Sequence, residues 1–245
     1  MLAVFKKEVA IYFLTPFGYV FMGLFLLLSG IVFSIYNLWG ARGDIYGMFG
    51  VLNFVSIVIF PVLTMKLLAE EKRMATDQLL FTSPVTVTSI ILGKYFAALF
   101  VYLVTLCATG VFAAFILIFS KTSLGAIIGS YVGFALLGAA YIAICLFASS
   151  LTDSQVTSAI IGFGFLFGFM IVGLLTNAIP FLFLKRVVSW FAILSKYEEF
   201  ANGLLKIGPL VYYLSFAVGF VFLTIIVVKG RLREKGGAKH EKDRH

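Results

Sequence analysis

The chain has 245 residues, of which 62% are hydrophobic and 12% charged, and its formal net charge is +8. Globular domains use roughly 45–50% apolar residues, so a soluble fold of this length could not bury so much apolar surface. The composition therefore excludes a soluble protein and predicts an all-α integral membrane protein.

The first 14 residues, MLAVFKKEVAIYFL, mix apolar side chains with Lys6, Lys7 and Glu8. This mixture predicts an amphipathic helix, 1–14, that leads into the first membrane span. No small-residue cleavage site follows a short apolar core, so we do not expect a cleavable signal peptide.

Six charge-poor stretches follow, and each is long enough for one crossing of about 20 apolar residues. Together with their connections they are expected to form a single transmembrane domain, 1–229. The predicted spans lie near 15–36, 48–68, 93–118, 125–149, 155–176 and 208–229. Pro61 lies inside the second span and should bend it, because proline removes a backbone donor. The bend either helps to frame a cavity or is passive shape.

Few polar side chains lie within the spans. Asn53, Ser56 and Thr64 are candidates for lining a path, although each could equally bond a neighbouring backbone. The sequence contains no G-x-x-x-x-G-K-[ST] phosphate loop, no paired carboxylates in a span and no cluster of metal ligands. It therefore disfavours an ion-coupled transporter and a membrane enzyme. No cofactor is expected, and ATP hydrolysis would require a separate subunit.

The segment between the second and third spans, EEKRMATDQLLFTSP, is unusually rich in charge. It predicts a short helix, 70–82, that ends at Ser83-Pro84 and is held by a span on either side. A partner protein could push on this helix, or it could be a solvated connection without a partner. Lys94, near the start of the third span, is expected to extend its ammonium group to water.

Small residues recur at intervals of four in two spans. Gly125, Gly129 and Gly133 share a face of the fourth span, and Gly164 and Gly168 share a face of the fifth. Such faces let helices approach closely, either within one subunit or across a dimer.

The turn LTDSQ connects the fourth and fifth spans. Thr152 and Gln155 have the spacing of a capping box, which would place Asp153 beside the positive end of the fifth helix.

Segment 177–206 contains an apolar stretch that is too short to cross, and it is expected to form an external re-entrant hairpin of short helices. Residues 230–245 form a basic tail, which suits anionic membrane lipid rather than nucleic acid. With the N-terminus inside, 13 of the 19 lysines and arginines lie on the cytoplasmic side and 6 outside. Both termini are therefore predicted to be cytoplasmic.

The charged segment resembles the ABC-2 transporter permease family, whose loop reads close to E-(E/R)-(K/R)-x-x-G-T-x-E-x-L-L-x-(S/T)-P and is followed by G-K. Ala75 and Gln78 depart from the usual glycine and glutamate. The turn LTDSQ and the segment YEEFANGLLKIGPLVYYLSF are most similar to permeases associated with gliding motility and with copper-enzyme maturation. The matching residues are Glu70, Glu71, Lys72, Arg73, Thr76, Leu79, Leu80, Thr82, Ser83, Pro84, Gly93 and Lys94.

The resemblance implies an ABC-2 (type V exporter-like) permease fold and an exporter half-unit in a bacterial inner membrane. A second permease chain would complete the pair, as a homodimer or a heterodimer. A separate cytoplasmic ABC ATPase subunit would bind ATP and magnesium. The helix 70–82 would be the coupling helix that docks into this ATPase, through Glu70, Glu71, Lys72, Arg73, Thr76, Asp77, Gln78, Leu79 and Leu80.

The resemblance also implies that the N-terminal helix contacts the ATPase and that the first, second and fifth spans line the path. The alternative to an exporter is a non-transport scaffold that anchors envelope or motility machinery.

Overall fold

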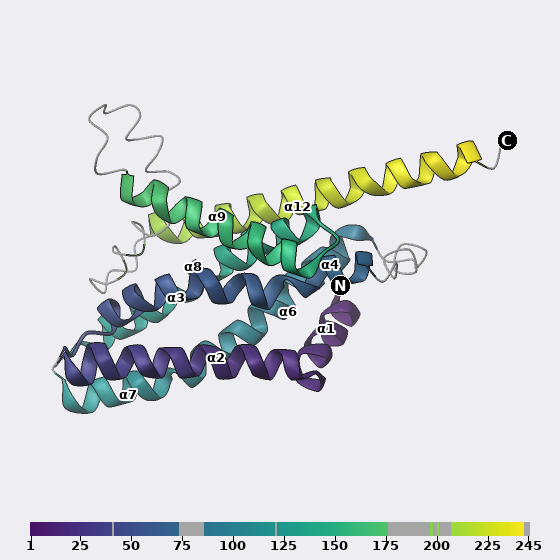
Figure 1. Ribbon diagram of the computed structural model, residues 1–245. Helices are drawn as coiled ribbons and strands as arrows, with labels where there is room; N and C mark the ends of the chain where they lie inside the picture. Colours follow the sequence, from purple (N-terminus) through teal and green to yellow (C-terminus); the bar gives the residue numbers. More distant parts are fainter. Residues whose placement is uncertain are drawn as a thin grey trace.

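The computed structural model describes residues 1–40, 42–73, 86–120, 122–175, 197, 200 and 207–242, and it describes side chains for all of these except 71–73 and 232–242. The fold is all-α, as the composition predicted (Figure 1). The helices are α1 (Leu2–Leu14), α2 (Pro16–Phe33), the π-helix η1 (Ser34–Trp39), α3 (Ile45–Thr64), α4 (Lys66–Arg73), α6 (Val87–Ala108), α7 (Gly110–Phe119), α8 (Leu124–Leu151), α9 (Gln155–Leu175) and α12 (Ile207–Lys242).

The described helices include six that are long and apolar enough to cross a membrane, which confirms the predicted number. They are Pro16–Trp39, Ile45–Glu70, Val87–Phe119, Leu124–Leu151, Gln155–Leu175 and Ile207–Arg231. The third begins six residues earlier than predicted, because the hydroxyl oxygen of Thr86 accepts a hydrogen bond from the backbone of Ser89 and caps the helix. This span is also two helices, α6 and α7, which meet at Thr109.

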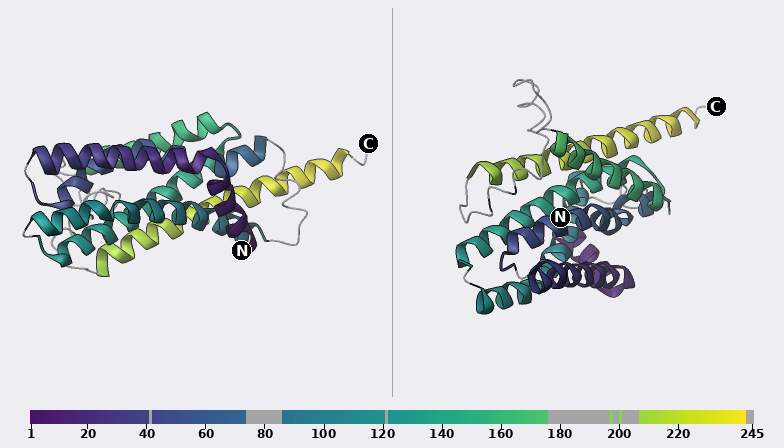
Figure 2. Two further views of the ribbon diagram at one scale, coloured as in Figure 1. Left: turned by 90° about the horizontal axis from the view of Figure 1, so that it is seen from below. Right: turned by 60° about the vertical axis from the view of Figure 1, so that its left-hand side comes forward.

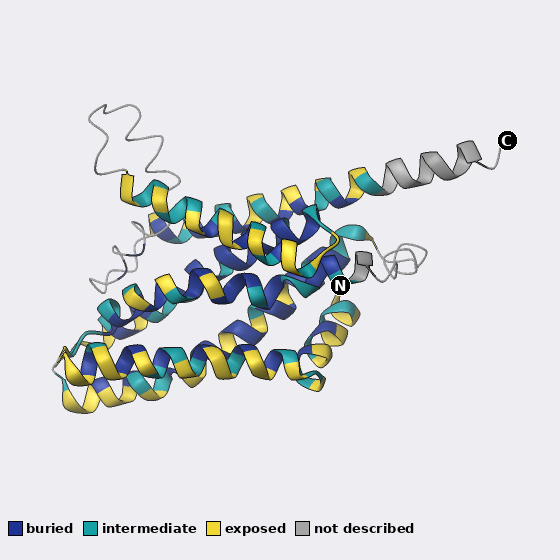
Figure 3. Ribbon diagram, viewed as in Figure 1, coloured by how far each residue is buried: buried dark blue, intermediate teal, exposed yellow. Residues whose placement is uncertain are grey.

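Helix α8 lies at the centre of the bundle and is the most buried of the six (Figure 3). Helices α3, α6, α9 and α12 all pack against it. On α8, Gly138 leaves room for the ring of Tyr102 from α6, whose hydroxyl group donates to the carbonyl oxygen of Phe134 at 2.7 Å. Phe134 in turn stacks on Phe49 of α3, with ring centroids 4.6 Å apart. The core is therefore built from aromatic rings that join three spans through α8.

The N-terminus, helix α4 and the C-terminal part of α12 lie at one end of the bundle, which we call the terminal end (Figures 1 and 2). Helix α12 does not stop at the end of its span but continues to Lys242, so the predicted basic tail begins as a helical extension. The orientation of this end relative to the cytoplasm stays a prediction.

Two predicted segments lie largely outside the described residues. Of the coupling helix, only residues 70–73 are described, as the last part of α4. Of the hairpin, only Tyr197 and Phe200 are described, and both are buried. Burial raises the pKa of the Tyr197 phenol.

The capping box predicted for the turn between α8 and α9 is wrong. Helix α9 begins at Gln155, and the hydroxyl oxygen of Ser154 accepts from the backbone of Thr157, three residues ahead. Thr152 instead accepts from the backbone of Ser154, which stabilises the turn. Asp153 therefore precedes the helix, and its carboxylate lies 3.6 Å from the guanidinium group of Arg231 on α12.

Candidate functional site

The segment Leu63–Ala69, where α3 gives way to α4, is the candidate functional site because it leads directly into the predicted coupling helix. We call it the α3–α4 junction. Helix α3 ends at Thr64 and α4 begins at Lys66; the Met65 N–H still donates to the carbonyl oxygen of Pro61 at 2.9 Å, so the helical pattern changes only after Met65. Backbone groups freed by such a change need partners when they are buried.

Helix α8 supplies one of these partners. The Ser149 hydroxyl oxygen accepts from the backbone N–H groups of Leu68 and Ala69, at 3.2 Å each. Its own hydrogen is directed to the carbonyl oxygen of Met65, at 3.4 Å. One buried serine therefore holds the chain on both sides of this change and ties the first turn of α4 to the central helix.

Helices α1 and α2 supply two more contacts. The Tyr12 hydroxyl group donates to the carbonyl oxygen of Leu63 at 3.0 Å. Burial raises the pKa of Tyr12, with a further contribution from nearby Glu8, so the phenol keeps the proton that it donates. The ammonium nitrogen of Lys66 lies 4.6 Å from the ring centre of Phe17 at the start of α2.

A buried ion pair lies beside the junction. The Lys94 ammonium group of α6 donates to a carboxylate oxygen of Glu8 on α1 at 2.9 Å, with side-chain exposures of 2% and 8%. The expectation that Lys94 extends to water is therefore wrong, because α1 covers it and offers a carboxylate. Gly93 makes this approach possible, since a Cβ there would lie 2.9 Å from a Val4 methyl carbon and 3.2 Å from the Phe5 nitrogen.

Only some of the predicted coupling residues lie in the part of the chain that the structure describes. Glu70, Glu71, Lys72 and Arg73 belong to the last turns of α4. The others, Thr76, Asp77, Gln78, Leu79 and Leu80, lie outside the described residues. Their role in docking stays a prediction.

The three candidate lining residues are all buried and all have partners. Asn53 accepts through its side-chain oxygen from the hydroxyl group of Tyr141 on α8, at 2.8 Å. The hydroxyl groups of Ser56 and Thr64 donate to the carbonyl oxygens of their own helix, at Leu52 and Phe60. Among the described residues the Asn53 amide nitrogen is buried without a hydrogen-bond partner, and the part of these three residues in lining a path stays a prediction.

The predicted glycine faces pack unevenly. Gly129 and Gly133 are buried, and a Cβ at Gly133 would lie 2.9 Å from the Phe200 side chain. At Gly125, Gly164 and Gly168 an added Cβ meets nothing within 4 Å, at least among the described neighbours. Their packing role stays a prediction. Two further glycines lie at close helix contacts, Gly93 in α6 and Gly138 in α8. Gly93 was named only for its match to the G-K of the family pattern, and Gly138 was not named, because neither belongs to a repeated interval.

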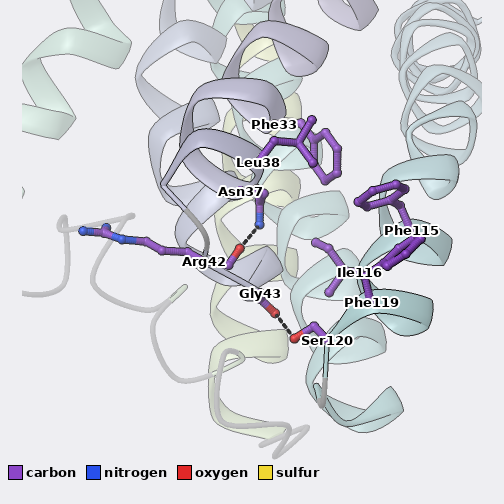
Figure 4. A pocket seen from close by; sticks show the side chains of 9 residues that line it. All are labelled: Phe33, Asn37, Leu38, Arg42, Gly43, Phe115, Ile116, Phe119 and Ser120. Carbon is purple, nitrogen blue, oxygen red and sulfur yellow. Dashed lines mark hydrogen bonds between the residues drawn. The ribbon is translucent and has the colours of Figure 1, made fainter.

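A pocket of about 330 Å³ lies at the opposite end of the bundle, between η1 and α7. It is lined by Phe33, Asn37, Leu38, Arg42, Gly43, Phe115, Ile116, Phe119 and Ser120 (Figure 4). The Asn37 amide group donates to the carbonyl oxygens of Arg42 and Asp44, at 2.8 and 3.1 Å, which closes the loop beside the pocket. The Arg42 side chain points away from the rings of Phe33, Phe115 and Phe119 (Figure 4), which form the apolar part of the wall.

No group of three His, Cys, Asp or Glu side chains that could hold a metal ion occurs in the described part of the chain. Residues 32–230 match the profile of the family described as "ABC-2 family transporter protein". No curated protein matches the chain.

Proposed function

The chain belongs to the ABC-2 transporter family, and from this premise we propose that it is the permease subunit of an exporter driven by a separate cytoplasmic ABC ATPase. The family and the six apolar helices establish a multi-pass membrane protein of the transporter class. The ATPase, the direction of transport and the inner-membrane location are the proposed part.

One observation carries the proposal. Helix α4, which leads into the charged segment, is held at its first turn by Ser149 of α8, next to the hydrogen bond from Tyr12 of α1. A force applied to the segment after Arg73 would therefore reach the central helix and the N-terminal helix directly. An unpartnered surface loop would not need this anchoring. ATP and magnesium would be bound by the ATPase, because the chain has no phosphate loop of its own.

We further propose that two permease chains pair in the membrane, as a homodimer or a heterodimer. Helix α9 is the least buried of the six candidate spans among the described residues, so it has an exposed face that lipid or a second chain could cover. The similarity of the turn LTDSQ to the gliding-motility and copper-maturation permeases is the basis for placing the transporter in that subgroup.

Purification of the chain with its candidate ATPase from membranes, followed by measurement of ATP hydrolysis, tests the proposal. The variant Glu71→Lys/Arg73→Glu reverses two charges after the α3–α4 junction and should reduce both association with the ATPase and ATP hydrolysis by the complex. The matched control is Arg42→Glu, which reverses an exposed charge at the opposite end and should preserve both.

If the charge-reversed variant binds the ATPase and supports hydrolysis as the wild type does, the coupling assignment is wrong. If the phenotype of the chain persists with a hydrolysis-deficient ATPase, the chain acts as a scaffold and not as an exporter subunit.

A further inference from the structure

We propose that α1 is a brace that joins the end of α3, from which α4 follows, to α6, so that the helices leading into and out of segment 74–85 form one body at the terminal end. The role of ATP in moving this body rests on the proposed function. The brace itself rests on two contacts of α1, one on each side of the segment.

The two contacts lie on the same face of α1, one helical turn apart. Tyr12 donates to the carbonyl oxygen of Leu63, three residues before α4 begins. Glu8 accepts from Lys94, eight residues after Thr86 caps α6. Residues four apart in a helix project to the same side, so α1 reaches α3 and α6 at once. Through the α3–α4 junction, α1 therefore connects the chain before segment 74–85 to the helix after it.

The second contact of α1, between Glu8 and Lys94, is an ion pair and not an apolar contact. A buried ion pair is often no more stabilising than a well-packed apolar pair of similar volume, because both ions lose their hydration. Breaking one partner is costly, since it leaves an uncompensated charge in a dry environment. Separating the two charged groups, or sliding α1 along α6, therefore costs more free energy than it would at an apolar contact. The role of the ion pair is to fix the position of α1 on α6.

The packing around the ion pair supports a fixed position. Gly93 admits the backbone of α1 to within van der Waals contact of α6, and the rings of Phe5 and Phe100 meet edge to face with centroids 6.0 Å apart. These contacts hold α1 against α6 at the level of the ion pair.

The brace has a mechanical consequence. Without it, a push on segment 74–85 could move α4 and the start of α6 apart, because the two helices belong to different spans. With α1 bonded to α6 and to Leu63 at the end of α3, the two helices move together, and the hydrogen bonds of Ser149 pass this movement to α8. Glu8 and Lys94 are accordingly positioning residues, and their loss should affect movement more than folding.

A distance measurement tests the brace. Spin labels at Leu2 of α1 and Leu103 of α6, both exposed, are placed in a background in which Cys107 and Cys145 are replaced by alanine. In the wild-type complex with its ATPase, we expect the same narrow distance distribution without nucleotide and with trapped ATP. The variant Glu8→Leu/Lys94→Met should unfold at nearly the wild-type temperature but show a broader distribution that changes with ATP, together with a several-fold loss of permease-dependent ATP hydrolysis.

The charge-exchanged variant Glu8→Lys/Lys94→Glu provides a second readout, because it restores the pair in the opposite sense. It should return the distribution toward the wild-type width, and either single reversal should not. The brace is overturned if the wild-type distance changes on ATP trapping, or if the apolar variant keeps the narrow distribution and full hydrolysis.

Failure of the proposed function would give a different result from failure of the brace. If no ATPase associates with the wild-type chain, the nucleotide-free distributions of the isolated permease still distinguish a fixed α1 from a loose one. A narrow wild-type distribution that broadens in the apolar variant then supports the brace, and equal widths overturn it.

Discussion

Gly138 shows how much a single missing side chain matters in this bundle. An ideal Cβ at this position would lie 2.3 Å from a ring carbon of Tyr102, a separation that cannot be relieved at the far end of a flexible side chain. The ring is also fixed by its hydrogen bond to Phe134 and by the edge of Phe60, 5.0 Å away between centroids. Gly138→Ala should therefore destabilise the protein by about 1–3 kcal/mol, the usual cost of overpacking.

Thermal unfolding in detergent measures this effect, and about 2–4 °C is expected per kcal/mol for a chain of this size. Gly125→Ala is the matched control on the same helix, because its Cβ meets nothing within 4 Å among the described residues. It should be neutral or slightly stabilising, since alanine favours helix more than glycine does. Equal unfolding temperatures for the two variants would contradict the close contact.

Asn53 and Tyr141 form a buried hydrogen bond that links α3 to α8. Tyr141→Phe removes the hydroxyl donor and leaves the side-chain oxygen of Asn53 without this hydrogen bond. Interhelical hydrogen bonds in membranes average about 0.6 kcal/mol and reach about 1.7, so a loss in that range is expected. A double-mutant cycle with Asn53→Leu isolates the pair, and strictly additive single effects would show that the bond contributes nothing.

At the scale of elements, the turn between α8 and α9 is held by the last span. The Arg231 guanidinium group donates to the carbonyl oxygen of Leu151 at 2.6 Å, which gives a partner to a group at the end of α8. Its contact with Asp153 is more exposed and longer. Arg231→Met should therefore cost about 1 kcal/mol, whereas Asp153→Asn should cost less than about 0.5 kcal/mol.

Unfolding temperatures and protease sensitivity at the turn measure the two effects separately. Arg231→Lys is the control, since a lysine retains the charge and one donor and should lose only part of the stability. A larger effect from Asp153→Asn than from Arg231→Met would show that the ion pair, and not the carbonyl contact, holds the turn.

Hydropathy predicted the elements well, because the length and polarity of a span are local properties. Six crossings and an all-α fold follow directly from charge-poor stretches of sufficient length. The third span was predicted to begin six residues late, at 93, because an apolar stretch marks the core of a helix and not its cap, which lies at Thr86. The burial of Lys94 was missed as well. Its partner, Glu8, lies 86 residues away in the sequence, so no local pattern shows that this lysine is buried.

The candidate site was predicted only in outline. The charged segment marks the place where α4 begins, but Ser149 and Tyr12, which hold the α3–α4 junction, carry no signature in the sequence. A serine inside an apolar span has many roles, and only tertiary packing selects one. The start of α9 at Gln155 agrees with the predicted span, but its cap was misassigned for a related reason, because Ser154 and Thr152 can both cap a helix and local spacing favoured Thr152.

At the scale of the whole molecule, the described spans range from a deeply buried one, α8, to a lightly buried one, α9. Helix α8 contacts α3, α4, α6, α9 and α12, whereas α9 packs on α8 and α3 and leaves most of its residues exposed or half-buried in a single chain. A permease that works as a pair needs a face for its partner, and α9 offers one on which Gly164 and Gly168 leave room for close approach. The sequence allowed these glycines to pack within one chain or between two, and the described structure has no neighbour within 4 Å of either.

Pairing through α9 predicts that Gly164→Leu shifts the permease from dimer to monomer without loss of stability, because nothing described in the chain contacts that position. Native mass spectrometry or photobleaching in bilayers measures the oligomeric state, and thermal unfolding measures the stability. Gly219→Leu on α12 is the matched control, since this glycine is also exposed within a span and also meets nothing within 4 Å among the described residues. If both variants remain dimers, the chains pair through another face. If both variants become monomers, a large side chain on any exposed span disrupts the dimer, and α9 has no special role in pairing.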